Sequence, residues 1–235
     1  MRRIFLSFIL FFIPTLLFFA GSTIEKEKEI VFSKTHCHNT TDEWQNLYNE
    51  MKLDSIISPD AFQQAINGYH MIKQKKREFL TLIDFSKAST EKRLFVLDMK
   101  NHKILFSSLV SHGKNSGEVY ATSFSNRSGS YKSSLGFYLT QETYYGSNGY
   151  SLRLAGLEKG INDNARARAI VVHGAPYANP SVARNGRLGR SFGCPAIPQA
   201  LTKPIIDTIK NGSVMFIYAP TYITQSTILQ NKNIL

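Results

Sequence analysis

Cys194 and His173 are the two residues whose types and spacing point most directly to chemistry. Cys194 lies in the run Gly189-Arg190-Ser191-Phe192-Gly193-Cys194-Pro195, and His173-Gly174 ends an apolar stretch 21 residues upstream. A thiol becomes a nucleophilic thiolate near neutral pH when a base takes its proton, and imidazole is the usual base. We therefore predict that Cys194 is the nucleophile of an acyl-transfer site and that His173 is its base.

The residues beside the pair fit the same chemistry. Gly193 leaves space for a substrate carbonyl to reach the sulfur, and it permits backbone angles that are closed to other residues. The N–H groups of Gly193 and Cys194 are predicted to hold the oxyanion that forms during acyl transfer. Ser191 is predicted to hydrogen-bond the imidazole or to line the pocket. The order of the pair differs from papain-like enzymes, in which the cysteine comes first.

The stretch Gly189–Pro198 resembles the catalytic signature of the L,D-transpeptidases of bacterial cell walls, and most closely that of the divergent murein L,D-transpeptidase catalytic domain family. The resemblance extends from about Asp84 to Tyr218. Two positions depart from the common pattern, because Phe192 stands where a second histidine is usual and Ala196 where Arg or Asn is usual. His173 is thereby left as the only nearby candidate base. Further matching stretches are 111–117, 133–136 and 156–158.

The resemblance implies a substrate and a reaction. The donor is a peptidoglycan stem tetrapeptide, attacked at the carbonyl between a diamino acid and the terminal D-Ala. D-Ala leaves, a thioester forms on Cys194, and an amine then takes the acyl group. No metal or organic cofactor is needed. The predicted substrate-binding residues are Arg190 and Arg187, which would pair with stem-peptide carboxylates, together with Ser134, in a turn that lines the pocket in the family, and Gly174.

Three alternatives stay open. With water as the acceptor, the same dyad would make an L,D-carboxypeptidase or another wall-peptide hydrolase. A non-catalytic peptidoglycan-binding domain would keep the fold and lose turnover, which the departures at Phe192 and Ala196 favour. Cys194 could instead pair with Cys37, since two cysteines in an oxidising compartment often form a disulfide. The motif His36-Cys37-His38 is too short and isolated to predict a metal site.

The N-terminus predicts export. Met1-Arg2-Arg3 is basic, residues 4–20 are almost wholly apolar, and Ala20-Gly21-Ser22 supplies small residues for cleavage, which is the pattern of a secretory signal peptide. The alternative is an uncleaved anchor, although 17 apolar residues interrupted by Pro14 are at the lower limit for a spanning helix. We expect the protein in the periplasm or cell envelope, with membrane association only through an uncleaved signal.

The charge of the chain fits an anionic partner. Its 28 basic and 17 acidic residues give a net charge of +11. A basic surface can bind nucleic acid, but an exported chain without a nucleic-acid motif is not expected to do so. Peptidoglycan, with its carboxylates, is the simpler partner. About 210 residues remain after the signal, which is enough for one hydrophobic core, and we expect a monomer.

The remaining chain divides into a linker over residues 23–40, a helical segment over 41–78, a catalytic domain over 79–220 and a tail over 221–235. In the helical segment, Ser58-Pro59-Asp60 is typical of a helix start. From residue 79 onward, short apolar runs bounded by Gly, Ser and Asn predict strands. The fold class is therefore mainly β with a few helices, an L,D-transpeptidase-like β-rich catalytic domain preceded by a short helical segment that packs on it.

The predicted strands can be given by their ranges. They cover 80–85, 93–99, 103–110, 137–140, 151–154, 169–172 and 214–218, and a helix is expected over 199–210 with Pro204 delaying its start. His102 and His112 belong to no recognisable motif, and we expect both on the surface.

Overall fold

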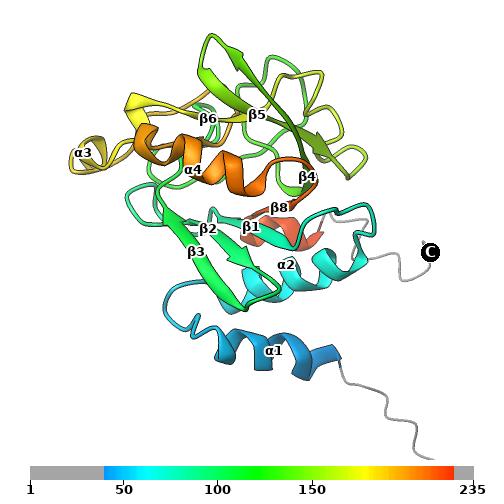
Figure 1. Ribbon diagram of the computed structural model, residues 1–235. Coiled ribbons are helices and arrows are strands. Elements are labelled where there is room, and N and C mark those ends of the chain that lie inside the picture. The colour runs from blue at the N-terminus through cyan, green and yellow to red at the C-terminus, as the bar shows by residue number, and fades with distance from the viewer. Residues whose placement is uncertain (1–39, 225–235) are drawn as a thin grey trace, which may run out of the picture. The chain divides into compact units, whose positions relative to one another are not determined.

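The computed structural model describes residues 40–224 (Figure 1). The predicted signal segment and cleavage site, residues 23–39 and residues 225–235 lie outside the described residues, and so does Cys37 with its alternative disulfide. The prediction of a mainly β fold with a few helices is confirmed. The elements are α1 Thr40–Glu50, α2 Pro59–Met71, β1 Phe79–Asp84, β2 Leu94–Asp98, β3 Lys103–Ser108, β4 Gly136–Gly146, β5 Gly149–Gly156, β6 Val171–Gly174, α3 Pro180–Ala183, β7 Ala196–Ile197, α4 Gln199–Ile209, β8 Val214–Tyr218, and the short 3-10 helices Pro176–Ala178 and Pro220–Thr224.

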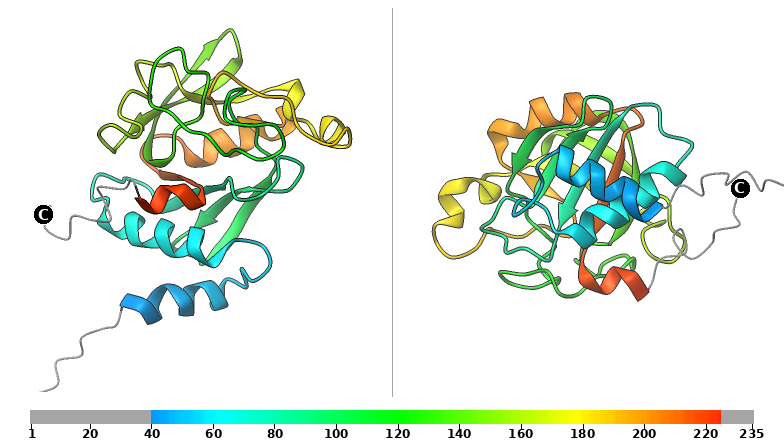
Figure 2. Two further views of the ribbon diagram at one scale, coloured as in Figure 1. Left: turned by 180° about the vertical axis from the view of Figure 1, so that it is seen from behind. Right: turned by 90° about the horizontal axis from the view of Figure 1, so that it is seen from below.

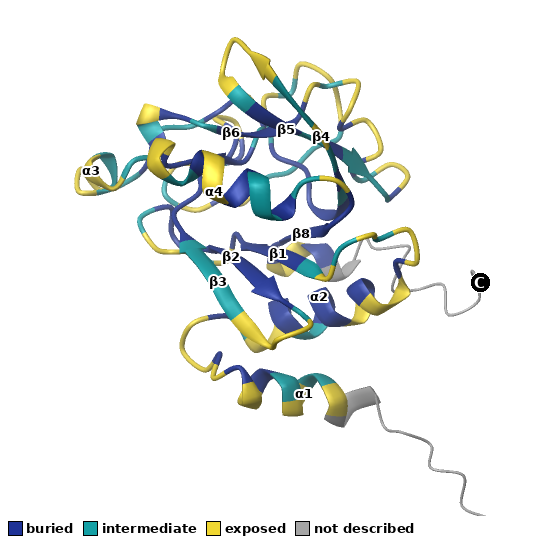
Figure 3. Ribbon diagram, in the orientation of Figure 1, coloured by how far each residue is buried: buried dark blue, intermediate teal, exposed yellow. Residues whose placement is uncertain are grey.

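Two helices precede the sheet. Ser58 is the N-cap of α2 and Pro59 its first residue, as the sequence predicts, although the Ser58 hydroxyl makes no capping hydrogen bond. On its inner side, α2 lies directly against the sheet, because a Cβ added at Gly68 would come within 2.0 Å of the Phe137 ring. Figure 3 shows the buried side of α2 turned toward the strands. Helix α2 therefore packs on the sheet.

The eight described strands form one sheet in the order β3-β2-β1-β8-β4-β5-β6-β7. Most neighbours are antiparallel, while β1–β8 and β6–β7 are parallel. The two outer strands come together, because Ser111 follows β3 and bridges Ala196 of β7, with its N–H donating to the Ala196 carbonyl (2.8 Å). The sheet is thus nearly closed, and the closure lies two residues beyond Cys194.

The hydrophobic core fills the space between the sheet and its covering helices. The rings of Phe137 and Phe216 stack with centroids 4.2 Å apart, and Tyr222 packs on both. The core therefore extends past the predicted domain end at residue 220. On another part of the sheet, α4 begins at Gln199, so the delay expected from Pro204 does not occur and the proline lies inside the helix.

The faces of the sheet near β6 are covered differently. On one face lies α4, which approaches closely because a Cβ at Gly174 would meet the Thr202 hydroxyl at 2.1 Å. Seen from behind, the loop-rich segment between β3 and β4 covers the side away from α4 (Figure 2). Within residues 40–224, no helix is long and apolar enough to cross a membrane.

Candidate active site

Cys194 lies at the edge of the sheet, where loop segments from distant parts of the chain meet. The segment after β3 runs beside the stretch that precedes the cysteine. Lys114 N–H donates to the Ser191 carbonyl (2.8 Å), and Ser191 N–H donates to the His112 carbonyl (3.0 Å). The two segments are therefore hydrogen-bonded like neighbouring strands, and the turn that carries the nucleophile is fixed on one side.

Gly193 is required by the backbone of this turn. Its φ is +127°, which side chains rarely adopt, and a Cβ there would lie 2.8 Å from the Lys132 carbonyl oxygen. The hydroxyl of Ser133 donates to the Gly193 carbonyl (3.2 Å) and accepts from the N–H of Gly113 (3.0 Å). Gly193 thus has a conformational reason to be glycine, while its part in catalysis stays a prediction.

Ser191 holds the turn rather than the imidazole. Its hydroxyl donates to the Cys194 carbonyl (2.6 Å) and accepts from the Gly193 N–H (3.0 Å). Within residues 40–224 the Ser191 hydroxyl makes no hydrogen bond to His173, and the alternative that Ser191 lines the pocket stays a prediction. The N–H of Gly193, one of the two predicted oxyanion donors, is engaged by this hydroxyl. The Cys194 N–H has no hydrogen-bond partner among residues 40–224, and it is the donor left for an oxyanion.

The Cys194 thiol is held against the start of β6. Sγ accepts a hydrogen bond from the Val171 N–H (3.5 Å) and donates to the Ala169 carbonyl (3.6 Å). Burial raises the pKa of the thiol, and the Val171 N–H and the positive charge of Arg168 oppose that rise. The thiol is therefore protonated in the resting protein, and a base must remove its proton during the reaction.

His173 has the properties of such a base. The side chain is only 4 % exposed, and this burial lowers the pKa of the imidazole. A hydrogen bond to the backbone of Gly174 opposes the change. Nδ1 lies 3.0 Å from the Gly174 carbonyl, so it carries the hydrogen and donates it. Nε2 has no hydrogen-bond partner in the described part of the chain. A neutral ring with an open Nε2 lone pair is the form that accepts a proton.

The strand register places Cys194 beside the strand that carries His173. β6 and β7 are parallel, and His173 lies beside Ala196. Two residues earlier in each of these two segments, the Val171 N–H donates a hydrogen bond to the Cys194 sulfur. Cys194 therefore lies beside the start of β6, the strand in which His173 follows Val171 by two residues. Within residues 40–224 neither side chain hydrogen-bonds the other, so the pairing of the thiol with the imidazole stays a prediction.

Arg187 and Arg190 are paired within the chain. Arg187 Nε lies 3.1 Å from one carboxylate oxygen of Glu118, and Arg190 contacts the other. Arg190 also donates to the carbonyls of Lys114 (3.0 Å) and Gly117 (3.1 Å). Both arginines border the site, but each already has an acidic partner that the sequence analysis did not identify. Their contact with substrate carboxylates stays a prediction.

Ser134 is buried, and its hydroxyl is engaged. It donates to the Ser125 carbonyl (2.9 Å) and accepts from Arg168. Arg168 also donates to the carbonyls of Ser125 (2.7 Å) and Lys132 (2.7 Å), so it fixes the loop that meets Gly193. This geometry gives Ser134 a positioning role through Arg168. Substrate contacts of Ser134 and of Gly174, which faces α4, stay predictions.

Two residues near the thiol were missed by the sequence analysis. The charge of Arg168 lowers the pKa of Cys194, and burial lowers the pKa of Arg168 itself. Burial, together with the nearby Cys194, raises the pKa of Tyr177 to about 12. Their signals in the sequence are weak, because Arg168 ends a polar run before a strand and Tyr177 follows a proline. Only the folded chain brings them close to the sulfur.

The two histidines outside the motif have different environments. His102 is exposed, as expected, and Nδ1 lies 2.8 Å from Glu50. The expectation for His112 is wrong, because its side chain is 1 % exposed. Arg93 donates to His112 Nδ1 (2.8 Å), and Nε2–H donates to the Gly117 carbonyl (3.1 Å). Burial and the charge of Arg93 lower the pKa of His112 to about 4. The ring is therefore neutral, with both nitrogens engaged.

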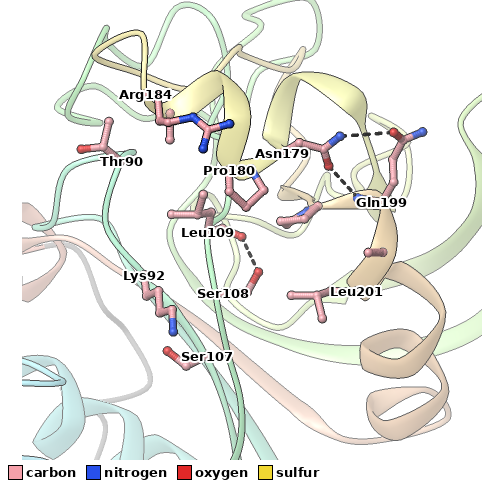
Figure 4. A pocket seen from close by; sticks show the side chains of 13 residues that line it. Thr90, Lys92, Ser107, Ser108, Leu109, Asn179, Pro180, Arg184, Gln199 and Leu201 are labelled. Carbon is pink, nitrogen blue, oxygen red and sulfur yellow. Dashed lines mark hydrogen bonds between the residues drawn. The ribbon is translucent and has the colours of Figure 1, made fainter.

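A cavity of about 790 Å³ lies beside α3 and the start of α4 (Figure 4). Its wall is mostly apolar, with Leu109, Pro180 and Leu201 among the lining side chains, and Lys92 and Arg184 add positive charge. Cys194 and His173 are not among its lining residues. Within residues 40–224, no group of three or more His, Cys, Asp or Glu side chains is arranged to hold a metal ion.

Comparison with known proteins identifies a family. The sequence profile of the L,D-transpeptidase catalytic domain matches residues 53–218 of this chain. None of the curated proteins has a sequence that matches it. The matched range contains both Cys194 and His173, and it begins between α1 and α2.

Several solved structures are similar to the chain at low sequence identity. An L,D-transpeptidase from Mycobacterium smegmatis is 15 % identical, with a TM-score of 0.38, over 60 % of this chain and 59 % of that one. L,D-transpeptidase 3 from Mycobacterium tuberculosis is 13 % identical, with a TM-score of 0.38, over 60 % and 61 %. A protein from Xylanimonas cellulosilytica is 16 % identical, with a TM-score of 0.36, over 60 % and 61 %. The chain thus spans about three fifths of the length of these relatives.

Proposed function

Because this chain belongs to the L,D-transpeptidase catalytic domain family, we propose that it is an exported, cysteine-dependent L,D-transpeptidase that acts on peptidoglycan stem peptides. One observation carries the proposal: a half-buried thiol lies beside the start of β6, and His173 of the same strand offers Nε2 as its open ring nitrogen. The N-terminal sequence pattern supports export to the periplasm or cell envelope. The family supports peptidoglycan as the substrate, without a cofactor.

The first half-reaction acylates the cysteine. His173 Nε2 takes the thiol proton while Sγ attacks the carbonyl carbon that precedes the terminal D-Ala of the donor. The carbonyl becomes an oxyanion, to which the Cys194 N–H donates a hydrogen bond. When the oxyanion collapses, the C–N bond breaks and the D-Ala amine leaves with the proton from His173. A thioester remains on Cys194.

The second half-reaction transfers the acyl group. An acceptor amine attacks the thioester carbonyl and gives its proton to His173, and the C–S bond then breaks. The thiolate takes back the proton from His173, which restores the resting site. With water in place of the amine, the same steps give a shortened peptide, and the protein would be an L,D-carboxypeptidase.

The electrostatics of the site favour proton transfer during the attack over a resting ion pair. Burial raises the pKa of Cys194 and lowers that of His173, so both groups are neutral at neutral pH. The charge of Arg168 then stabilises the thiolate as it forms. The turn that carries the sulfur is fixed by hydrogen bonds of Ser191, Ser133 and Gly193. These residues position the thiol and take no part in proton transfer.

Intact-mass measurement tests the proposal. The purified protein is incubated with a stem tetrapeptide, and the expected adduct has the mass of the peptide minus D-Ala. Cys194→Ser should give no thioester, and Cys37→Ser should give as much as the unchanged protein. Absence of any adduct on a folded protein would favour a non-catalytic wall-binding domain.

The released products decide between transfer and hydrolysis. With an amine acceptor present, a cross-linked dimer supports the transpeptidase, whereas a tripeptide alone supports the carboxypeptidase. The acceptor is a second stem peptide whose diamino acid carries a free amine. If equal amounts of tripeptide form with and without this acceptor, the transferase assignment is wrong.

A further inference from the structure

Two exposed aromatic rings and a lysine lie beside the nucleophile. Phe192 is 66 % exposed and Tyr131 is 42 % exposed. Their ring centroids are 4.8 Å apart, with the planes tilted by 47°. The Lys114 ammonium lies 4.4 Å from the Tyr131 centroid and 4.7 Å from that of Phe192. We call these three residues the aromatic platform. Large exposed rings that touch each other are unusual on a surface and often mark a binding site.

The aromatic platform is held in place by its backbone. Lys114 is fixed to Ser191, next to Phe192, through the hydrogen bond between its N–H and the Ser191 carbonyl. Tyr131 has φ +54°, a left-handed conformation that is unfavourable for a bulky side chain and typical of functional sites. Asn115 maintains it, because its N–H donates to the Tyr131 carbonyl (3.2 Å) and its side-chain amide donates to the Ser130 carbonyl (2.9 Å).

The composition of the aromatic platform indicates the ligand. One face of a pyranose ring consists of C–H bonds and packs on the negative face of an aromatic ring. Lys114, held over both rings, has N–H donors for hydroxyl and acetamido oxygens. The adjacent cation, Arg190, is paired with Glu118, and the ammonium of Lys114 is itself held over the two rings rather than presented alone. A neutral sugar therefore fits better than an anion.

The size of the surface also favours a sugar over a protein. A stable protein interface covers about 800 Å² on each partner, far more than two rings and a lysine provide. A single sugar unit, by contrast, is comparable in size to one aromatic ring. The patch is also continuous with the site, because Phe192 and Cys194 are two residues apart and their Cα atoms are at most about 7 Å apart.

We propose that Phe192, Tyr131 and Lys114 bind an N-acetylated sugar of the glycan strand, so that the protein prefers stem peptides still attached to their sugar. The preference rests on the proposed function. In such a donor, the attacked carbonyl is about three residues from the sugar, at most about 10 Å along the peptide. A stem of this length can therefore reach from the sulfur to the aromatic platform, since Phe192 is only two residues from Cys194.

Sugar binding is tested without turnover. In the Cys194→Ser protein, the N-acetylglucosamine tetramer is titrated by calorimetry or NMR. We expect saturable binding that Phe192→Ser weakens about tenfold, the scale of one good aromatic contact. Phe192→Trp keeps an aromatic face and should retain binding. The matched control is Tyr145→Ser, which removes an 81 % exposed ring that also pairs with a neighbour, Tyr150 (5.2 Å).

The substrate preference is tested by kinetics in the active protein. The ratio of kcat/KM for a disaccharide-linked tetrapeptide to that for the free tetrapeptide should exceed one. Phe192→Ser should lower this ratio about tenfold, and Tyr145→Ser should leave it unchanged. A ratio that does not respond to Phe192→Ser would overturn the preference.

The two proposals fail separately. No binding of the tetramer, or equal weakening by Phe192→Ser and Tyr145→Ser, overturns the aromatic platform as a sugar site even where the Cys194 thioester forms. If binding depends on Phe192 but the unchanged protein forms no thioester, the sugar site is supported and the proposed transpeptidase activity is contradicted.

Discussion

His173 and His112 are both buried and both carry a lowered pKa, yet their surroundings suit them to different tasks. His112 uses both ring nitrogens, one toward Arg93 and one toward the Gly117 carbonyl. His173 uses only Nδ1, toward the Gly174 carbonyl. The number of engaged nitrogens, rather than burial or pKa, separates a structural histidine from a candidate base.

The same difference extends to the neighbouring groups. The ring of His112 lies next to a buried guanidinium, which repels a second positive charge and keeps the imidazole neutral. For His173, burial is the main influence on the pKa, and no cation contributes. His173 can therefore take a proton briefly when a thiol supplies it. The two environments predict different responses to mutation and to pH.

The largest expected effect is on the rate of acylation. His173→Ala should lower it by about a hundredfold or more, the usual scale for a lost general base. Raising the pH should recover part of the rate, because solvent then generates thiolate. The measurement is the time course of adduct formation by mass spectrometry, with His70→Ala, at an exposed position of α2, as the control. Full activity of His173→Ala at neutral pH would show that His173 is not the base of Cys194.

His112 should instead govern stability as a function of pH. Its pKa is about 4 in the folded protein and about 6.5 when unfolded, so below pH 6.5 the unfolded chain binds a proton that the folded chain does not. Stability should therefore fall as the pH drops from 6.5 to 4, by roughly 3 kcal/mol from this group.

Urea unfolding across this pH range measures that effect. His112→Gln has no titrating ring and should have a smaller pH dependence than the unchanged protein, whatever its stability at neutral pH. Identical pH slopes for the two proteins would show that His112 is not the group responsible.

A smaller effect is expected at Arg168. Arg168→Met removes the charge that lowers the pKa of Cys194, so this pKa should rise and acylation should slow by about tenfold. The pKa is read from the pH dependence of thiol alkylation. Arg168→Lys keeps the charge and should restore the pKa even if the loop that Arg168 fixes is loosened. If neither variant moves the pKa, Arg168 acts only on the loop.

The smallest effect concerns the acid limb of activity. His173 must be neutral to act, and its pKa is lowered, so the rate should fall only at pH values below about 6.5, the ordinary value for histidine. Between pH 7 and 6.5 the change should be slight. An acid limb centred above pH 6.5 would contradict the buried, neutral base.

The sequence predicts those parts of the structure that depend on local pattern. Apolar runs predict the strands, and 214–218 coincides with β8. The chemistry proposed for Cys194 and His173 is likewise inferred from residue type and order, and it stays a prediction. Strand β4 extends to Gly146, well past the predicted 137–140, because its second half is a polar, half-exposed hairpin without an apolar run.

The rest depends on contacts between distant residues. Glu118 pairs with arginines about seventy residues away, and nothing near Glu118 in the sequence indicates this. His112 is buried because Arg93 and the Gly117 carbonyl satisfy its ring, and the sequence alone does not reveal either partner. The bonds of the Ser191 hydroxyl to the Gly193 N–H and the Cys194 carbonyl depend on the conformation of the turn, which periodicity does not predict.

The bridge between Ser111 and Ala196 affects when the site forms during folding. Strand β7 has two residues, and it is supported by β6 on one side and by Ser111 on the other. Ser111 and Ala196 are 85 residues apart, and contacts of such separation form late in folding because a long loop must first be closed. Before that moment, the turn that holds Cys194 beside β6 is not closed on its other side. Under the proposed function, reactivity toward substrate is thus a property of the completed fold, because an unfolded chain has the cysteine without the surroundings that position it.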